Sequence, residues 1–356
     1  MLKYFMKCLR VVSEFVKWKI KNKIWHDKRS QKILRNKNKK RRHSSHKHGK
    51  KHNKVYICTA PKNFSIINNA TECIGFFDDI IKKIDEHSFK AQFVIDTSNV
   101  ETVTVDAIMY IIALLKDVRT KTSRALSYKF RGNYPKNPEA RRVFVESGFT
   151  EYVNSNNKNI APTTSRIHIM SGKTYNNAVA KEVCLFVQEH CNVTRKDTIP
   201  LYNTLIELML NTHNHAYNDN HYDSSACEWY LYAEKIDNYV RFAFLDTGEG
   251  IPNTVYKKFV EKISLHKKDS DFIVSALNGD FRTQTRQNNR GKGLPQIKKC
   301  CTTGLLKDVC IFSGKGLCKI NNETFDLTQN DYKTSFLGTL FSWNIAIKEE
   351  NLNDLH

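Results

Sequence analysis

The sequence predicts an α/β protein made of two α+β sandwich domains, at residues 55–157 and 165–348, behind a basic leader at residues 1–54. Three observations support this prediction. Positive charge is concentrated in the leader, strand and helix signals alternate through the first domain, and the second domain combines a hairpin-like strand pair with glycine-rich turns. With 356 residues and 40% apolar content, the chain is long enough for two packed cores.

The leader accounts for almost all of the net charge. Residues 1–54 hold 20 of the 57 Lys and Arg residues but only two acids, Glu14 and Asp27, and so carry +18 of the net +21. The remainder of the chain is nearly neutral. The basic character therefore belongs to one segment and not to the whole protein.

The first part of the leader has the pattern of a basic amphipathic helix. Apolar residues recur at spacings of three and four, with lysines between them: Leu2, Phe5, Leu9, Val12, Phe15 or Val16, Ile20 and Ile24. Such a helix is suited to an anionic membrane surface, to a partner protein, or to packing on its own protein. Residues 39–54 lack an apolar anchor and predict a disordered tether. This polycation either contacts nucleic acid or acidic lipid without sequence preference, or serves as a solubilising linker.

Cysteine usage and hydropathy indicate a cytoplasmic protein. The ten cysteines form no CxxC repeat and predict buried free thiols in a reducing compartment. No uncharged apolar run reaches the roughly 18 residues of a membrane-spanning helix. Lysines interrupt the apolar start of the chain, which therefore does not resemble a signal peptide. Attachment at a membrane surface is expected only if the leader supplies it.

Residues 55–157 alternate between strand and helix signals. A short buried strand at 93–95 leads through a turn at 96–99 into an apolar helix from about residue 105 to 115. The later stretch "LSYKFRGNYPKNPEARRVFVESGF" predicts a strand, a proline-containing turn, and a helix ended by Gly148. This alternation is typical of a small α/β layer domain.

The "IDTSNV" strand and turn, with the helix that follows, resemble the STAS domain, the fold of anti-sigma-factor antagonists, over about residues 55–155. STAS antagonists that are switched by phosphorylation carry a serine at the start of this helix. Here the stretch is Thr104, Val105, Asp106 and Ala107, so a phosphoswitch is not supported. Asp106 is expected to be a helix N-terminal acid favoured by the helix dipole, with a fixed phosphate mimic as the alternative. The resemblance then implies a module that binds a protein partner.

A polar stripe runs along the apolar helical segment "IELMLNTHNHAYN" at residues 206–218. Glu207, Asn211 and His215 are four residues apart and therefore share one face of the helix. The opposite face carries Leu205, Leu208 and Met209 toward a core. Taken alone, such a stripe is explained by a helix face in contact with water.

Three further motifs follow the stripe in order. The strand pair "EWYLYAE" and "YVRFAFL" leads into "DTGEGIP", with Asp246 at the strand end and with Gly248, Gly250 and Ile251 in the turn. In "NRGKGLPQIKK", Gly291, Gly293 and Leu294 lie at the start of a helical stretch, where free backbone N–H groups suit phosphate oxygens. "LGTLFSWNI" predicts a terminal strand with Gly338 and Thr339 at its start.

The order E-x3-N, D-x-G-x-G-I, G-x-G-L and G-T-x-F resembles the GHKL (Bergerat-fold) ATPase domain of histidine kinases, anti-sigma-factor kinases, type II topoisomerases and mismatch-repair ATPases. The resemblance spans about 180 residues and implies ATP and Mg²⁺ as cofactors. It assigns Mg²⁺ to the carbonyl oxygen of Asn211. It assigns catalysis to Glu207, which would orient or deprotonate a water or a protein hydroxyl. Asp246 would accept from the exocyclic amine of adenine and disfavour guanine, with support from the Thr339 hydroxyl.

The same resemblance implies an ATP lid, a mobile loop, in the long polar segment between residues 253 and 290. Its candidates for phosphate binding are basic residues near its end: Arg282, Arg286, Arg290 and Lys292. Histidine kinases often carry a lysine three residues after the metal-binding asparagine, but Asn214 stands there. Phosphate binding is therefore expected from the lid.

The sequence is compatible with three functions. The first is a regulatory ATPase or serine/threonine-type protein kinase of the anti-sigma-factor kinase kind, whose STAS-like domain recognises a partner. The second is a module with little turnover, in which ATP opens or closes a clamp on nucleic acid or protein. The third is a histidine kinase, disfavoured because no two long amphipathic helices precede residue 165. An ATP-dependent homodimer is compatible with each of them.

Overall fold

The computed structural model describes residues 54–86, 91–121, 129–153, 164–216, 227–259, 267–280 and 293–348. The chain divides into two units, and every described residue belongs to the unit made of residues 54–260 and 267–356. The basic leader and the predicted lid residues 281–290 lie outside the described ranges, so the expectations about them stay predictions. No helix within the described ranges has the length and hydropathy needed to cross a bilayer.

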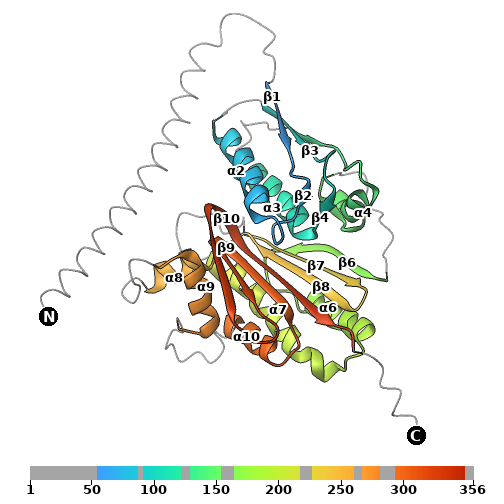
Figure 1. Ribbon diagram of the computed structural model, residues 1–356, viewed down its shortest axis with the longest axis vertical. Coiled ribbons are helices and arrows are strands. Elements are labelled where there is room, and N and C mark those ends of the chain that lie inside the picture. The colour runs from blue at the N-terminus through green and yellow to red at the C-terminus, as the bar shows by residue number, and fades with distance from the viewer. Residues whose placement is uncertain are drawn as a thin grey trace, which may run out of the picture. The chain divides into compact units, whose positions relative to one another are not determined.

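The N-terminal half of this unit is built on a three-stranded parallel sheet in the order β1-β3-β5 (Figure 1). Its strands are β1 (Lys54–Thr59), β3 (Ala91–Asp96) and β5 (Lys129–Gly132). A short parallel pair accompanies it, formed by β2 (Asn63–Phe64) and β4 (Thr102–Val103). The helices are α2 (Ala70–Glu86), α3 (Val105–Lys121), α4 (Pro138–Glu146) and α5 (Phe149–Val153).

The C-terminal half contains a five-stranded antiparallel sheet in the order β6-β7-β8-β10-β9. Its strands are β6 (Arg166–Gly172), β7 (Trp229–Ile236), β8 (Tyr239–Asp246), β9 (Lys307–Ile320) and β10 (Leu327–Ala346). Its helices are α6 (Asn177–Cys191), α7 (Arg195–Ala216), α8 (Ile251–Phe259), α9 (Asp269–Asn278) and α10 (Gly293–Thr302).

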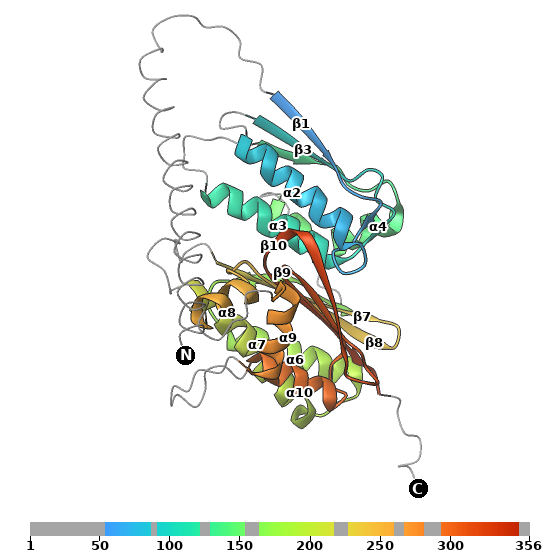
Figure 2. The same ribbon diagram turned by 60° about the vertical axis from the view of Figure 1, so that its left-hand side comes forward.

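The five-stranded sheet is buried on both faces, as the alternation along β8 shows. Phe242 and Phe244 belong to a core that includes buried residues of α6, α7, α9 and α10. Ala243 and Leu245, which point the other way, belong to a second core with buried residues of α2 and α3. Figure 2 shows the resulting layers: the three-stranded sheet, helices α2 and α3, the five-stranded sheet, and the C-terminal helices.

Most of the elements expected from the sequence are confirmed. The buried strand predicted at 93–95 is β3, and the apolar helix predicted from about residue 105 is α3. Gly148, the expected helix stop, follows α4 with a positive φ of 84°. The apolar face predicted for α7 is buried at Leu205, Leu208 and Met209. The nine cysteines within the described residues are buried free thiols.

Two boundary predictions are wrong. The segment between 253 and 290 is not polar loop throughout, because α8 and α9 occupy parts of it. In α9, Phe272, Ile273 and Leu277 recur at helical spacing and are buried, which overrides the polar average of the segment. Likewise, Gly338 does not lie at the start of the last strand: β10 begins at Leu327, and Gly338 sits at a register shift within it.

Asp106, expected to be an N-terminal acid of a helix, is the second residue of α3 and is buried. Its carboxylate accepts hydrogen bonds from the Ile67 N–H, at 2.9 Å, and from the Thr104 hydroxyl. Burial raises the pKa of this carboxyl group above its ordinary value, while these hydrogen bonds act in the opposite direction. The side chain therefore tethers the start of α3 to the loop before α2 and is not presented to solvent.

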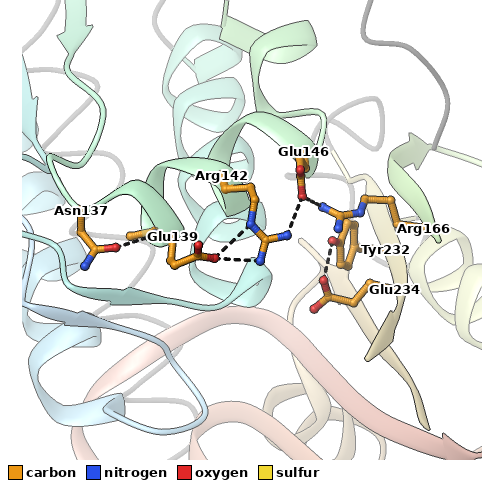
Figure 3. A network of polar contacts seen from close by, with 8 residues as sticks. Asn137, Glu139, Arg142, Glu146, Arg166, Tyr232 and Glu234 are labelled. Atoms are coloured by element: carbon orange, nitrogen blue, oxygen red, sulfur yellow. Dashed lines mark hydrogen bonds and ion pairs between the residues drawn. The ribbon is translucent and has the colours of Figure 1, made fainter. Parts of the chain in front are cut away.

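A chain of ion pairs joins α4 to the first strand of the five-stranded sheet (Figure 3). Arg142 contacts Glu139 at 2.9 Å and Glu146 at 3.2 Å, and Glu146 in turn pairs with Arg166 of β6. The side chain of Arg166 is only 12% exposed, and its Nε is buried without a hydrogen-bond partner among the described residues. Within the described residues, the guanidinium of Arg166 therefore has its ion pair with Glu146.

Glu146→Gln is predicted to lower the free energy of unfolding by about 1–3 kcal/mol, because it removes the carboxylate that pairs with the largely buried Arg166. Glu139→Gln is the matched control on the same helix. The Glu139 side chain is 76% exposed, so its removal is expected to change stability by less than about 0.5 kcal/mol. Urea unfolding of both variants measures the difference; equal values would contradict the dependence of Arg166 on Glu146.

Candidate nucleotide site

Asp246 lies at the end of β8, between Trp229 of β7 and Thr339 of β10 in the strand register. It continues the face of β8 that carries Phe242 and Phe244, which is the face covered by the C-terminal helices. Those two phenylalanines are fully buried, whereas Asp246 keeps partial exposure. The strand therefore ends by presenting a carboxylate at the margin of the apolar core.

Backbone turns after β8 hold this carboxylate in place. The Gly248 N–H donates to Asp246 Oδ1 at 2.8 Å. Gly250 has a φ of +81°, and an added Cβ there would lie 2.9 Å from Ser313 Oγ. The "DTGEGI" motif therefore needs glycine at 250 both for its conformation and for its closeness to β9.

Ser313 of β9 connects the turn to the last strand. Its Oγ accepts from the Ile251 N–H at 2.8 Å and donates to the Gly338 carbonyl at 3.1 Å. The same oxygen lies 3.0 Å from Thr339 Oγ1. Ser313 was not among the residues predicted from the sequence, and no motif marks it, because its role depends on strand pairing.

Gly338 allows β10 to approach β8 closely. Its φ is +80°, and a Cβ built on it would lie 1.8 Å from the Asp246 carbonyl oxygen. Any side chain here would push the two strands apart. The glycine of the G-T-x-F motif thus brings Thr339 next to Asp246.

Burial raises the pKa of Asp246 to about 6, and hydrogen bonds from the Gly248 N–H and from the Thr339 side chain and backbone partly offset this effect. The carboxyl group is therefore mostly ionised at neutral pH but protonates under mildly acidic conditions. A carboxylate held near its titration point at a partly exposed position is a candidate functional group.

Glu207 and Asn211 lie on α7, in the helical layer that covers the same face of the sheet as Asp246. Both are partly exposed. Helix α7 also contacts α10, where Thr204 Oγ1 of α7 lies 3.9 Å from Cys300 Sγ.

His215 belongs to α7, but its side chain is outside the described residues, and so are Arg282, Arg290, Gly291 and Lys292. Gly293 is the first residue of α10, and Leu294 packs partly buried against the core.

The structure thus brings one part of the predicted set into a hydrogen-bonded cluster. That cluster contains Asp246, Gly248, Gly250, Ile251 and Thr339, together with Ser313 and Gly338. Glu207 and Asn211 form a second group on the facing helical layer.

A separate pocket of about 310 Å³ lies on the opposite face of the five-stranded sheet. Charged residues in its lining include Asp106, Arg241, Asp308 and Lys319. None of the predicted site residues lines it. It is therefore distinct from the candidate nucleotide site.

Comparison with family models and with curated proteins finds no match to this chain. The interpretation of the site consequently depends on its own residues and geometry.

Asp246→Asn is predicted to stabilise the fold at about pH 8 by up to about 3 kcal/mol, with most of the difference lost near pH 4. The folded protein binds this proton more tightly than the unfolded chain between the ordinary pKa of 3.8 and about 6, so ionisation costs stability as the pH rises through that window. Asparagine retains an oxygen that can accept from Gly248. Denaturant unfolding of wild type and variant across this pH range tests the sign. The predicted sign is contradicted if the stability of Asp246→Asn relative to wild type is lower at pH 8 than at pH 4.

Gly338→Ala is predicted to destabilise the protein by about 3 kcal/mol or more, since it combines a left-handed backbone with a severe approach to the Asp246 carbonyl. Gly304→Ala separates the two effects: Gly304 has a φ of +74° but nothing within 4 Å of its added Cβ. The control should lose about 1 kcal/mol. Thermal unfolding of both variants measures the gap, and similar losses would show that the strands are not tightly apposed.

Proposed function

We propose that this chain is an ATP-binding regulatory protein with Mg²⁺-dependent ATPase or protein-kinase activity of the anti-sigma-factor kinase type. The observation that carries the proposal is the Asp246 cluster: a partly exposed carboxylate beside Thr339, held by a glycine turn, at the margin of the helix-covered face. Its N-terminal half supplies the contact to a protein partner.

The hydrogen-bonding groups around Asp246 suit an adenine ring. A carboxylate has about four acceptor positions; the Gly248 N–H occupies one on Oδ1, and the side chain and backbone of Thr339 also donate to this carboxylate. Remaining acceptor capacity at the partly exposed group can receive the exocyclic amine of adenine, whereas guanine offers an oxygen at that position and is repelled. Without Cβ atoms, Gly250 packs against Ser313 and Gly338 packs against Asp246, which would fix the carboxylate and Thr339 for the base.

Glu207 and Asn211 fit the phosphate end in this proposal. The amide oxygen of Asn211 is a hard ligand of the kind that Mg²⁺ accepts, and bound Mg²⁺ would neutralise phosphate charge. Glu207, one turn away on α7, would orient or deprotonate the attacking hydroxyl. Residues 281–292 would complete the site as its lid.

Partner recognition is assigned to the N-terminal half because its sheet has an exposed apolar edge. Val55 and Ile57 of β1 are 51% and 64% exposed. Large apolar side chains on an edge strand are typical of a surface that another protein covers. Contacts of the leader with nucleic acid or an anionic membrane, and an ATP-dependent homodimer, belong to the same proposal.

Calorimetric titration with Mg²⁺ and ATP or GTP tests nucleotide recognition. Wild type is expected to bind ATP and to prefer it to GTP, and Asp246→Asn to lose roughly tenfold or more in ATP affinity. Asp237→Asn, at the exposed turn that precedes the same strand, is the matched control and should bind as wild type does.

Turnover is tested separately by following phosphate release. Glu207→Gln is expected to bind ATP with near wild-type affinity but to release no phosphate. Absence of ATP binding by wild type, or equal binding of ATP and GTP, would overturn the proposed recognition. ATP binding without any turnover in wild type would favour the nucleotide-gated clamp.

A further inference from the structure

Helix α3 of the N-terminal half contacts the strand segment that carries Thr339, and it does so from the face of the sheet opposite the candidate nucleotide site. The Tyr110 hydroxyl accepts a hydrogen bond from the Leu337 N–H at 3.1 Å. The Tyr110 ring stacks on Phe336 with centroids 4.4 Å apart. Tyr110 is buried and therefore fixes the two residues directly before Gly338 and Thr339.

A second contact from α3 reaches the segment that carries Asp246. Lys116 Nζ lies 2.8 Å from Glu228 Oε2, and the Tyr230 hydroxyl donates to the same carboxylate oxygen at 2.8 Å. The backbone of Glu228 is paired with Thr247, the residue after Asp246. Thr247 N–H donates to the Glu228 carbonyl at 3.0 Å, and the Glu228 N–H donates to Thr247 Oγ1 at 2.9 Å.

The Lys116–Glu228 pair differs from an ordinary surface ion pair. Its side chains are 35% and 19% exposed, and Lys116 Nζ lies 5.1 Å and 5.3 Å from the ring centroids of Tyr152 and Tyr230. The surface pair Lys62–Glu101 in the same half has a similar separation of 2.8 Å, but its side chains are 73% and 61% exposed. Solvent screens the second pair much more than the first.

We infer that Tyr110 and Lys116 are positioning residues for the nucleotide site: from behind the sheet, they hold the two backbone segments that present Thr339 and Asp246. This inference rests on the proposed function and adds regulation to it. Because the two contacts come from one helix, a change in the N-terminal half alters both sides of the site together. By thermodynamic reciprocity, a partner on the N-terminal half that changes nucleotide affinity by some factor has its own affinity changed by the same factor when nucleotide binds.

The test uses the full-length chain and the variants Tyr110→Phe and Lys116→Met, with Lys116→Arg as rescue and Lys62→Met as matched control. Amide hydrogen exchange without nucleotide is the first readout. Tyr110→Phe should speed exchange at Leu337, and Lys116→Met at Thr247, each by about three- to tenfold, while the control changes neither. Tyr110→Phe should change amide exchange less at Thr247 than at Leu337, and Lys116→Met should change it less at Leu337 than at Thr247.

ATP affinity is the second readout. Both variants should weaken binding by about three- to tenfold while the melting temperature falls by only about a few degrees, and Lys116→Arg should restore binding to within about twofold. The inference is overturned if amide exchange in Tyr110→Phe and Lys116→Met does not differ from that in the Lys62→Met control. It is also overturned if both variants bind ATP as tightly as wild type while Asp246→Asn has lost ATP affinity. A wild type that binds no nucleotide contradicts the proposed function, and the exchange pattern alone then decides whether α3 positions these segments.

Discussion

Burial of the five-stranded sheet on both faces is the constraint on which the rest of this structure depends. Antiparallel sheets commonly leave one face to solvent and alternate apolar with polar residues. Here β8 sends Phe242 and Phe244 into one core and Ala243 and Leu245 into the other. The middle of β8, from Phe242 to Leu245, is therefore buried and entirely apolar, and the charged side chains of this strand lie on either side of it, at Arg241 and at the strand end, Asp246. The candidate site lies at this strand end.

Asp246 directly follows this apolar stretch of β8, and its carboxylate therefore has an energetic cost. Placing a carboxylate at the margin of an apolar core raises its pKa and costs stability at neutral pH, and the Gly248 N–H and Thr339 recover only part of that cost. A structural role alone would be met better by a neutral side chain. Functional sites are where such local costs are tolerated, and this makes Asp246 informative about function.

The second buried face has a different consequence. Because α2 and α3 cover the sheet behind the candidate site, the N-terminal and C-terminal halves share a core. A connection of this kind is more rigid than a linker between independent domains. The ion-pair chain through Glu146 and Arg166 adds a polar connection at β6. Under the proposed function, signals between the halves would therefore travel through packed side chains.

Local patterns in the sequence determined the secondary structure and part of the site. The strand pair β7–β8, the apolar face of α7 and the glycines of "DTGEGI" each depend on neighbours in the chain, and the structure has them as expected. The helices inside residues 253–290 were missed because a polar average hid the buried face of α9. Tertiary structure alone decided the roles of Ser313, Tyr110 and Lys116. Lys116 and Glu228 are 112 residues apart, and Tyr110 and Leu337 are 227 residues apart. Contacts at such separations leave no periodic trace in a sequence, because only the pairing of strands and the packing of helices bring these residues together.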